Sequence, residues 1–156
     1  MQPMTYYDVF ARLTAAVGTG MLIGLDRELR RKPAGLRTMA LVGLGSAVFV
    51  LATIDPARGY GYTDATSHVV QGIVTGIGFL GAGAILRGTS EDSVRGLTTA
   101  ASIWLAAAAG IACGLANWPL VIGGCVLGVL VLVTSPVERA IHNRRRTDVG
   151  SGEVRS

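Results

Sequence analysis

The sequence contains little charge for its size. Only 15% of its 156 residues are charged, whereas 50% are hydrophobic, and soluble domains carry about 25% charged residues. The mean hydropathy is +0.49. The scarcity of charge argues against an ordinary soluble domain and favours an integral membrane protein.

Cysteine is also scarce. Cys113 and Cys125 each lie inside an apolar run, and no CxxC or Cys/His cluster accompanies them, which argues against a zinc site. Two interpretations stay open, a disulfide or buried thiols acting as small apolar groups. The N-terminus also lacks the basic region and cleavage site of a signal peptide. Its first apolar stretch is therefore interpreted as a helix that the protein retains.

The apolar segments predict transmembrane helices. A bilayer core of about 30 Å requires roughly 20 apolar residues, and residues 36–54 and 69–86 meet that requirement. Residues 97–137 contain no charge, and as one helix they would reach about 60 Å. Pro119, which follows Gly114, Asn117 and Trp118, marks the only suitable turn, because proline favours the first turn of a new helix. We therefore predict two helices here, at 97–115 and 119–135.

The first helix is predicted over residues 7–25, with Arg12 extending to the membrane surface. A short interfacial or re-entrant segment is the alternative. The predicted fold class is all-α, an integral membrane bundle of about five transmembrane helices with Gly-rich close packing. We expect a membrane domain at 1–137 and a disordered, basic cytoplasmic tail at 138–156. That tail acts either as a topology anchor or as a binding segment for anionic lipids.

The basic residues predict the orientation, because Lys and Arg collect on the cytoplasmic side. Twelve of the fourteen lie in the first loop, the third loop or the tail, and only Arg12 and Arg58 lie on the opposite side. Five spans place those two loops and the C-terminus on one face. We predict a multi-pass protein of the bacterial inner membrane, with its N-terminus outside and its C-terminus in the cytoplasm. The net charge of +4 thus reflects topology and does not indicate nucleic-acid binding.

Glycine is abundant, with 22 copies spread through the apolar segments. Residues 76–81 match the GxGxxG nucleotide fingerprint, but they lie within a predicted span and lack the required acidic residue. Instead, small residues let helices pack closely. The predicted packing positions of the third helix are Gly72, Gly76, Gly78, Gly81 and Gly83. The same spacing recurs at Gly20/Gly24, Gly110/Gly114 and Gly124/Gly128. These glycine faces suit either internal packing or contact between two copies.

Few polar residues lie within the predicted spans. Gln71 and Thr75 share one helix face and are the candidates for a polar spot inside the bundle, while Ser46, Thr98, Thr99 and Ser102 could form hydrogen bonds between helices. Spans two to five contain no Asp, Glu, Lys or His in their interiors. This disfavours a proton-coupled carrier and a Mg²⁺ site built of carboxylates. A hydrated ion in a polar pore stays open.

Charged residues gather at the predicted cytoplasmic face. Asp26, Arg27 and Glu28 end the first helix, Arg37 opens the second, and Arg95 precedes the fourth. Asp26 and Arg30 have the i,i+4 spacing of a helical ion pair. The cluster either fixes helix ends or forms a docking surface for a partner. No nucleophile and base, metal-ligand set or cofactor motif accompanies it, so we expect no enzyme activity and no cofactor.

Three segments resemble the MgtC/SapB membrane proteins. They are Gly24–Glu28 with Gly35–Thr38, Gly76–Ile85, and Val94–Trp104. The resemblance implies a bacterial membrane protein linked to magnesium limitation, stress and survival inside host cells, and partners such as ATP synthase or cation-transporting ATPases. It also implies that the functional positions include Asp26, Arg27, Glu28, Arg37, Arg95 and Thr98. Virulence-type members carry a further soluble C-terminal domain, which is not expected for this chain, so a virulence role stays open.

Two functions remain in competition. The first is a non-enzymatic accessory protein or regulator in magnesium homeostasis, acting on other membrane proteins. The alternative is a transporter or pore for Mg²⁺ or another cation, in which Gln71 or Thr75 affects flux. Either function is compatible with a homo-oligomer.

Overall fold

The computed structural model describes residues 4–54, 64–87 and 94–134. Five helices make up almost all of this part of the chain. They are α1 (Tyr6–Leu29), α2 (Leu36–Leu51), α3 (Asp64–Gly83), α4 (Leu97–Gly114) and α5 (Trp118–Val133). Two short strands, β1 (Leu86–Arg87) and β2 (Val94–Arg95), pair antiparallel between α3 and α4. The predicted all-helical class therefore holds apart from this small hairpin.

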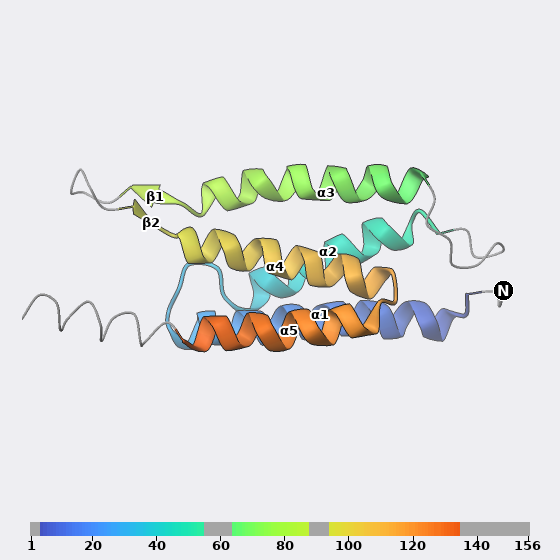
Figure 1. Cartoon of the computed structure of the whole chain (residues 1–156), viewed down its shortest axis with the longest axis horizontal. Helices are drawn as coiled ribbons and strands as arrows, with labels where there is room; N and C mark the ends of the chain where they lie inside the picture. Colours follow the sequence, from blue (N-terminus) through green and yellow to red (C-terminus); the bar gives the residue numbers. More distant parts are fainter. Residues whose placement is uncertain (1–3, 55–63, 88–93, 135–156) are drawn as a thin grey trace, which may run out of the picture.

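The helices lie side by side along one axis (Figure 1). The turn between α1 and α2, the β1–β2 pair and the end of α5 lie at one end, and the start of α1 lies at the other. The two basic connections and the last described helix thus share an end, in agreement with the sequence pattern. The predicted tail at 138–156 and Arg58 lie outside the described residues.

Several predicted helix boundaries are wrong. The first helix, the least certain from sequence, is the longest, with 24 residues or about 36 Å. The third begins five residues earlier than predicted and ends at Gly83, because the chain then enters β1. The second and fifth have 16 residues each, or about 24 Å. The predicted turn at Asn117 and Pro119 is confirmed, and the Asn117 side chain accepts a hydrogen bond from the Leu120 amide.

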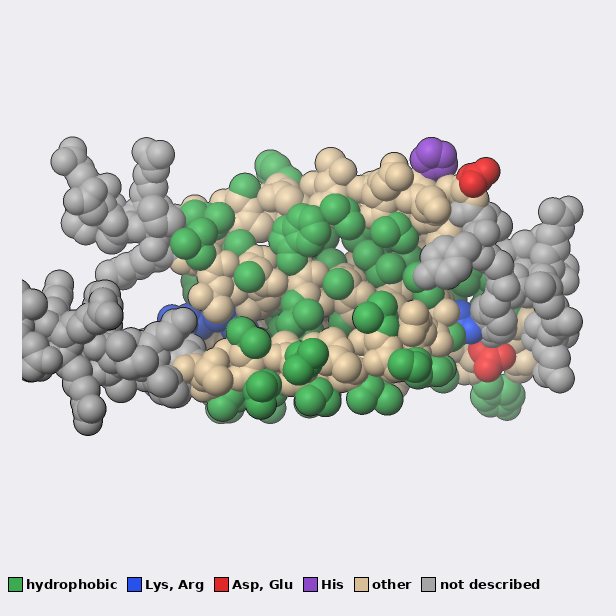
Figure 2. All heavy atoms as spheres, viewed as in Figure 1, with side chains coloured by type: hydrophobic (Ala, Val, Ile, Leu, Met, Phe, Trp, Pro, Cys, Tyr) green, Lys and Arg blue, Asp and Glu red, His purple; other side chains and the backbone are tan. Residues whose placement is uncertain are grey.

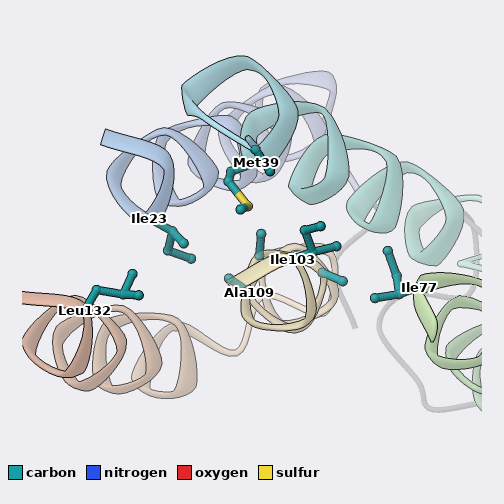
Figure 3. Packing of buried hydrophobic residues seen from close by; sticks show 9 residues of the cluster. Ile23, Met39, Ile77, Ile103, Ala109 and Leu132 are labelled. Carbon is teal, nitrogen blue, oxygen red and sulfur yellow. The ribbon is translucent and has the colours of Figure 1, made fainter. Parts of the chain in front are cut away.

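Helix α4 forms the centre of the core. Its Ile103 and Ala109 meet apolar side chains that come from each of the other four helices (Figure 3). These are Ile23 of α1, Met39 of α2 and Ile77 of α3, together with Leu132 of α5. Every other helix therefore contributes to one core around α4.

Glycines bring α1, α2 and α4 close together. A Cβ added at Gly43 of α2 would lie 2.7 Å from the Ala16 carbonyl oxygen of α1, and one added at Gly110 of α4 would collide with the Gly43 carbonyl oxygen. Gly20 and Gly24 of α1 likewise face the backbone of α2. Only glycine permits this separation, which confirms the predicted Gly-rich close packing for these three helices.

Three described turns use left-handed backbone: one at Arg31 between α1 and α2, with φ 51°, and two at the ends of α4. Gly96, at the start of α4, has φ 98° and leaves no room for a side chain beside the Ala84 carbonyl. Ala116 ends α4 with φ 54° in a Schellman motif, where the Asn117 amide donates to the Ala112 carbonyl. Alanine pays a steric cost there that glycine would not.

The exterior of the bundle is apolar. On the face shown in Figure 2, apolar side chains run along the length, and charged side chains lie near the two ends. The exposed residues include Phe10, Leu22, Phe49, Phe79, Leu127 and Val131. By length and composition, α1 and α4 are the described helices that could cross a membrane, while α2 and α5 are apolar but shorter.

Candidate functional site

An arginine buried between two helices forms the centre of the candidate site. Arg27 of α1 is only 3% exposed, and its guanidinium donates to the Thr99 hydroxyl of α4. Thr99 is itself 2% exposed. The bond joins residues 72 positions apart and fixes the end of α1 to the start of α4.

The guanidinium of Arg27 is incompletely satisfied. Its Nε is buried and has no hydrogen-bond partner among the described residues. An unpaired buried donor costs about 1–3 kcal/mol and more for a charged group. The hydrogen bond to Thr99 therefore stabilises this region, since its loss would leave the buried guanidinium with one partner fewer.

A second buried arginine holds the other end of α4. Arg12 of α1 is 4% exposed, and its Nη1 donates to the Gly114 carbonyl oxygen at 2.7 Å. The prediction that Arg12 extends to the surface is therefore wrong. The carboxyl end of a helix carries unpaired carbonyls and partial negative charge, which makes it a suitable acceptor. Arg12 and Arg27 are about 22 Å apart along α1, so α1 is hydrogen-bonded to both ends of α4.

Sequence reasoning missed this arrangement in part. Thr99 was recognised as a possible interhelical donor or acceptor, whereas the resemblance pointed to its neighbour Thr98. The Thr98 side chain is exposed, and its carbonyl accepts from Ser102 within α4. Nothing in the sequence indicated that Arg12 binds Gly114, because the acceptor is a backbone carbonyl 102 positions away.

The two acidic residues of the cluster stabilise helix ends. Asp26 forms the predicted pair with Arg30, with Oδ1 and Nε 2.6 Å apart. Glu28 is exposed, and its carboxylate accepts from the Leu36 amide at 3.2 Å. It therefore caps α2, whose own N-cap residue, Gly35, has no side chain to do so.

The remaining basic members of the cluster do not converge on Arg27. The Arg37 side chain is exposed at the first turn of α2. Arg95 belongs to β2, and its side chain lies outside the described part of the structure. Arg27 is thus buried, and its hydrogen bond to Thr99 clamps α1 to α4. Glu28 and Arg37 are exposed at the same end of the bundle.

The predicted polar spot does not lie inside the bundle. Gln71 and Thr75 are both exposed on α3, and the Thr75 hydroxyl donates to the Gln71 carbonyl of its own helix at 2.9 Å. They are four residues apart on a face that α3 turns away from α4, because Ile77 and Gly81 are the positions that face the core. Gln71 and Thr75 do share one face of α3, as predicted, but that face points away from the bundle and not into it.

The predicted packing glycines of α3 are mostly uncovered. A Cβ added at Gly72, Gly76, Gly78 or Gly83 would meet nothing within 4 Å. Gly81 alone among the five approaches α4, where an added Cβ would lie 3.7 Å from Trp104 and Ala100. Internal packing therefore does not account for this stripe, and contact with another molecule stays a prediction.

A groove separates α3 from α2 over most of their lengths. Its volume is about 750 Å³, and its lining is mainly apolar residues and glycines, including Leu41, Gly45 and Phe49 of α2 and Gly72, Gly76 and Leu80 of α3. The polar residues of the lining are Thr38, Ser46 and His68. A second hollow of about 480 Å³ lies at the start of α2, and its charged lining residues are Glu28 and Arg37. Thr38 lines both.

The described residues offer no metal centre. Within residues 4–54, 64–87 and 94–134, no group of three or more His, Cys, Asp or Glu side chains could hold an ion. Cys113 and Cys125 are both buried, and neither forms a disulfide within the described residues. Cys113 lies 4.0 Å from the Thr19 hydroxyl of α1, which agrees with the packing interpretation.

Fold and site together describe a helical bundle with an apolar exterior and buried arginine clamps, as in membrane proteins. The family model described as the MgtC family matches residues 13–143. The chain therefore belongs to the MgtC family. This confirms the resemblance seen in the three sequence segments.

Named relatives agree with this assignment. The chain is 42% identical to Protein SrpB of Synechococcus elongatus over 130 residues, which is 78% of this chain and 71% of SrpB. It is 43% identical to Protein MgtC of Salmonella typhimurium strain LT2, over 74% of this chain and 47% of MgtC. It is also 39% identical to the "Putative magnesium transporter YhiD" of Escherichia coli K12, over 83% of this chain and 60% of YhiD.

The chain spans about half to seven-tenths of the length of these relatives. No solved structure matches it. The family and its magnesium-related members support a membrane protein connected with magnesium.

Proposed function

We propose that the chain is a non-enzymatic accessory protein of the bacterial inner membrane that acts on other membrane proteins in magnesium homeostasis. In this proposal all five helices form an integral bundle, with the α1–α2 turn and the β1–β2 pair in the cytoplasm. The magnesium connection comes from the named relatives. The apolar exterior supports the bilayer placement, because a patch of this extent is unusual on a protein in water.

One observation carries the accessory role. The buried arginines of α1 donate hydrogen bonds to α4, Arg27 to Thr99 and Arg12 to Gly114, so their role is to stabilise the bundle. Among the exposed charged side chains, Glu28 and Arg37 lie at one end around a hollow. This division suits a protein that presents a fixed charged surface to a partner, and the α3 glycine stripe offers a further contact for a partner or a second copy.

A transporter is the second candidate, because the Escherichia coli relative is named as a putative magnesium transporter. Flux measurement separates the two. Purified protein in liposomes should admit no more Mg²⁺ than protein-free vesicles under the same gradient. Mg²⁺ entry that Gln71→Leu or Thr75→Val reduces would refute the accessory role and support a pore.

The docking surface has its own test. In cells that depend on the protein at low Mg²⁺, Arg37→Gln should abolish both growth and co-purification of a membrane partner. Arg31→Gln is the matched control, because Arg31 is an exposed arginine of the same end of the bundle. Equal behaviour of the two variants, with both proteins folded, would argue against a docking role for Arg37.

A further inference from the structure

We propose that the groove between α2 and α3 binds one phospholipid with a zwitterionic, primary-amine head group such as phosphatidylethanolamine. Its acyl chain lies in the groove, and its head group lies in the hollow at Glu28 and Arg37. The inference rests on the bilayer placement proposed above and not on the accessory role. It accounts for Gly72 and Gly76, two of the four uncovered glycines of α3.

The first argument is the shape of the groove. Along α2 it runs from Thr38 to Phe49, about 16 Å of helix, and one leaflet of a bilayer core is about 15 Å deep. The groove therefore fits a lipid chain that enters from one leaflet.

The second argument is the space that the glycines leave. A Cβ added at Gly45, Gly72 or Gly76 would meet nothing within 4 Å, and all three glycines line the groove. These positions face one another from α2 and α3, at the edge of the bundle where α3 lies (Figure 1). An acyl chain is flexible and narrow enough to fill such a space with van der Waals contacts.

The third argument is that a polar hollow lies next to the apolar groove, because Thr38 lines both. An apolar groove beside a charged hollow has the pattern of an amphiphile. The charged residues that line the hollow are one carboxylate, Glu28, and one guanidinium, Arg37. A head group with one phosphate and one ammonium complements them, since arginine is well suited to phosphate. A purely anionic head group would pair with Arg37 but would leave the Glu28 carboxylate without a cationic partner.

The test uses the whole protein, purified in detergent and analysed by native mass spectrometry with equal amounts of phosphatidylethanolamine and phosphatidylglycerol carrying identical chains. We expect at least about fivefold more of the amine lipid bound. Arg37→Gln and Glu28→Gln should each bring the ratio close to one. Glutamine at position 28 keeps an oxygen that can accept from the Leu36 amide, so the α2 cap survives.

A second pair of variants tests the groove itself. Gly76→Leu fills the groove and should lower the binding of both lipids about fivefold or more, whereas Gly123→Leu, an exposed glycine of α5 with equal free space, should leave binding unchanged. Circular dichroism verifies folding of each variant.

Three outcomes would overturn the proposal. Equal retention of both lipids by the wild type would indicate non-selective lipid contact. A dimer without bound lipid that Gly76→Leu dissociates would show that a second copy occupies the groove. Recovery of the protein in the soluble fraction, without detergent, would refute the bilayer placement itself.

Discussion

Alanine substitution of glycine should have opposite effects on the two sides of the bundle. At Gly43 of α2, the new Cβ would lie 2.7 Å from the Ala16 carbonyl oxygen, whereas ordinary contact begins at 3.4 Å. The helices α1 and α2 must therefore separate by about 0.7 Å at this point. Overpacking of this kind costs about 1–3 kcal/mol, and the helix propensity of alanine returns at most about 1 kcal/mol.

At Gly76 of α3 the same substitution meets nothing within 4 Å. Only the gain in helix propensity remains, so Gly76→Ala should leave the free energy of unfolding unchanged or raise it by up to about 1 kcal/mol. Gly110→Ala should be the most destabilising of the three, because its Cβ would collide with the backbone of α2. Backbone cannot move aside as a flexible side chain can.

The measurement is unfolding of each variant in mixed micelles, with sodium dodecyl sulfate as the denaturant and helical circular dichroism as the signal. The midpoint should fall for Gly43→Ala and Gly110→Ala and should stay or rise for Gly76→Ala. If all three variants shift the midpoint in the same direction by the same amount, the close approach of α1, α2 and α4 is refuted.

Three further substitutions test the clamps and a turn by the same unfolding assay. Thr99→Val should lower the free energy of unfolding by about 1–3 kcal/mol, because it leaves the buried Arg27 with one acceptor fewer. Thr98→Val, at the adjacent exposed position, should lower it only slightly. An equal loss of stability in the two variants would contradict the Arg27 hydrogen bond. Arg12→Met should cost about 1.5–3 kcal/mol through the lost charged hydrogen bond to the end of α4, and a neutral result would place that guanidinium elsewhere. Ala116→Gly should stabilise the protein by about 0.5–1 kcal/mol by relieving the left-handed backbone, and a loss of stability would contradict the Schellman turn.

The order of the first four helices could be predicted from the sequence because charged residues mark the connections between them. The turn before Pro119 lies in a segment without charge, and it could be predicted because proline and asparagine act on their immediate neighbours. The end of the third helix was not predictable from hydropathy. Residues 84–86 are apolar, yet the chain leaves the helix to form β1, whose partner lies eight residues further on.

The direction in which a helix face points also could not be read from sequence. Gln71, Thr75, Gly72 and Gly76 lie near one another on α3, as predicted, but hydropathy does not distinguish a glycine face that meets another helix from one that stays open. The same limit explains Arg12. An arginine near a helix end suits either the membrane surface or a buried backbone acceptor, and the acceptor became evident only when α4 was in place.

The long separations of the two arginine bonds have a consequence for how the protein is made. The acceptors of Arg12 and Arg27 are synthesised 102 and 72 residues later. In the proposed bilayer placement, a nascent chain that has inserted its first three helices therefore carries two guanidiniums whose α4 acceptors have not yet been synthesised. Assembly of the bundle is thus coupled to delivery of the fourth segment, and a chain truncated before Leu97 should be a preferred target for membrane quality-control proteases.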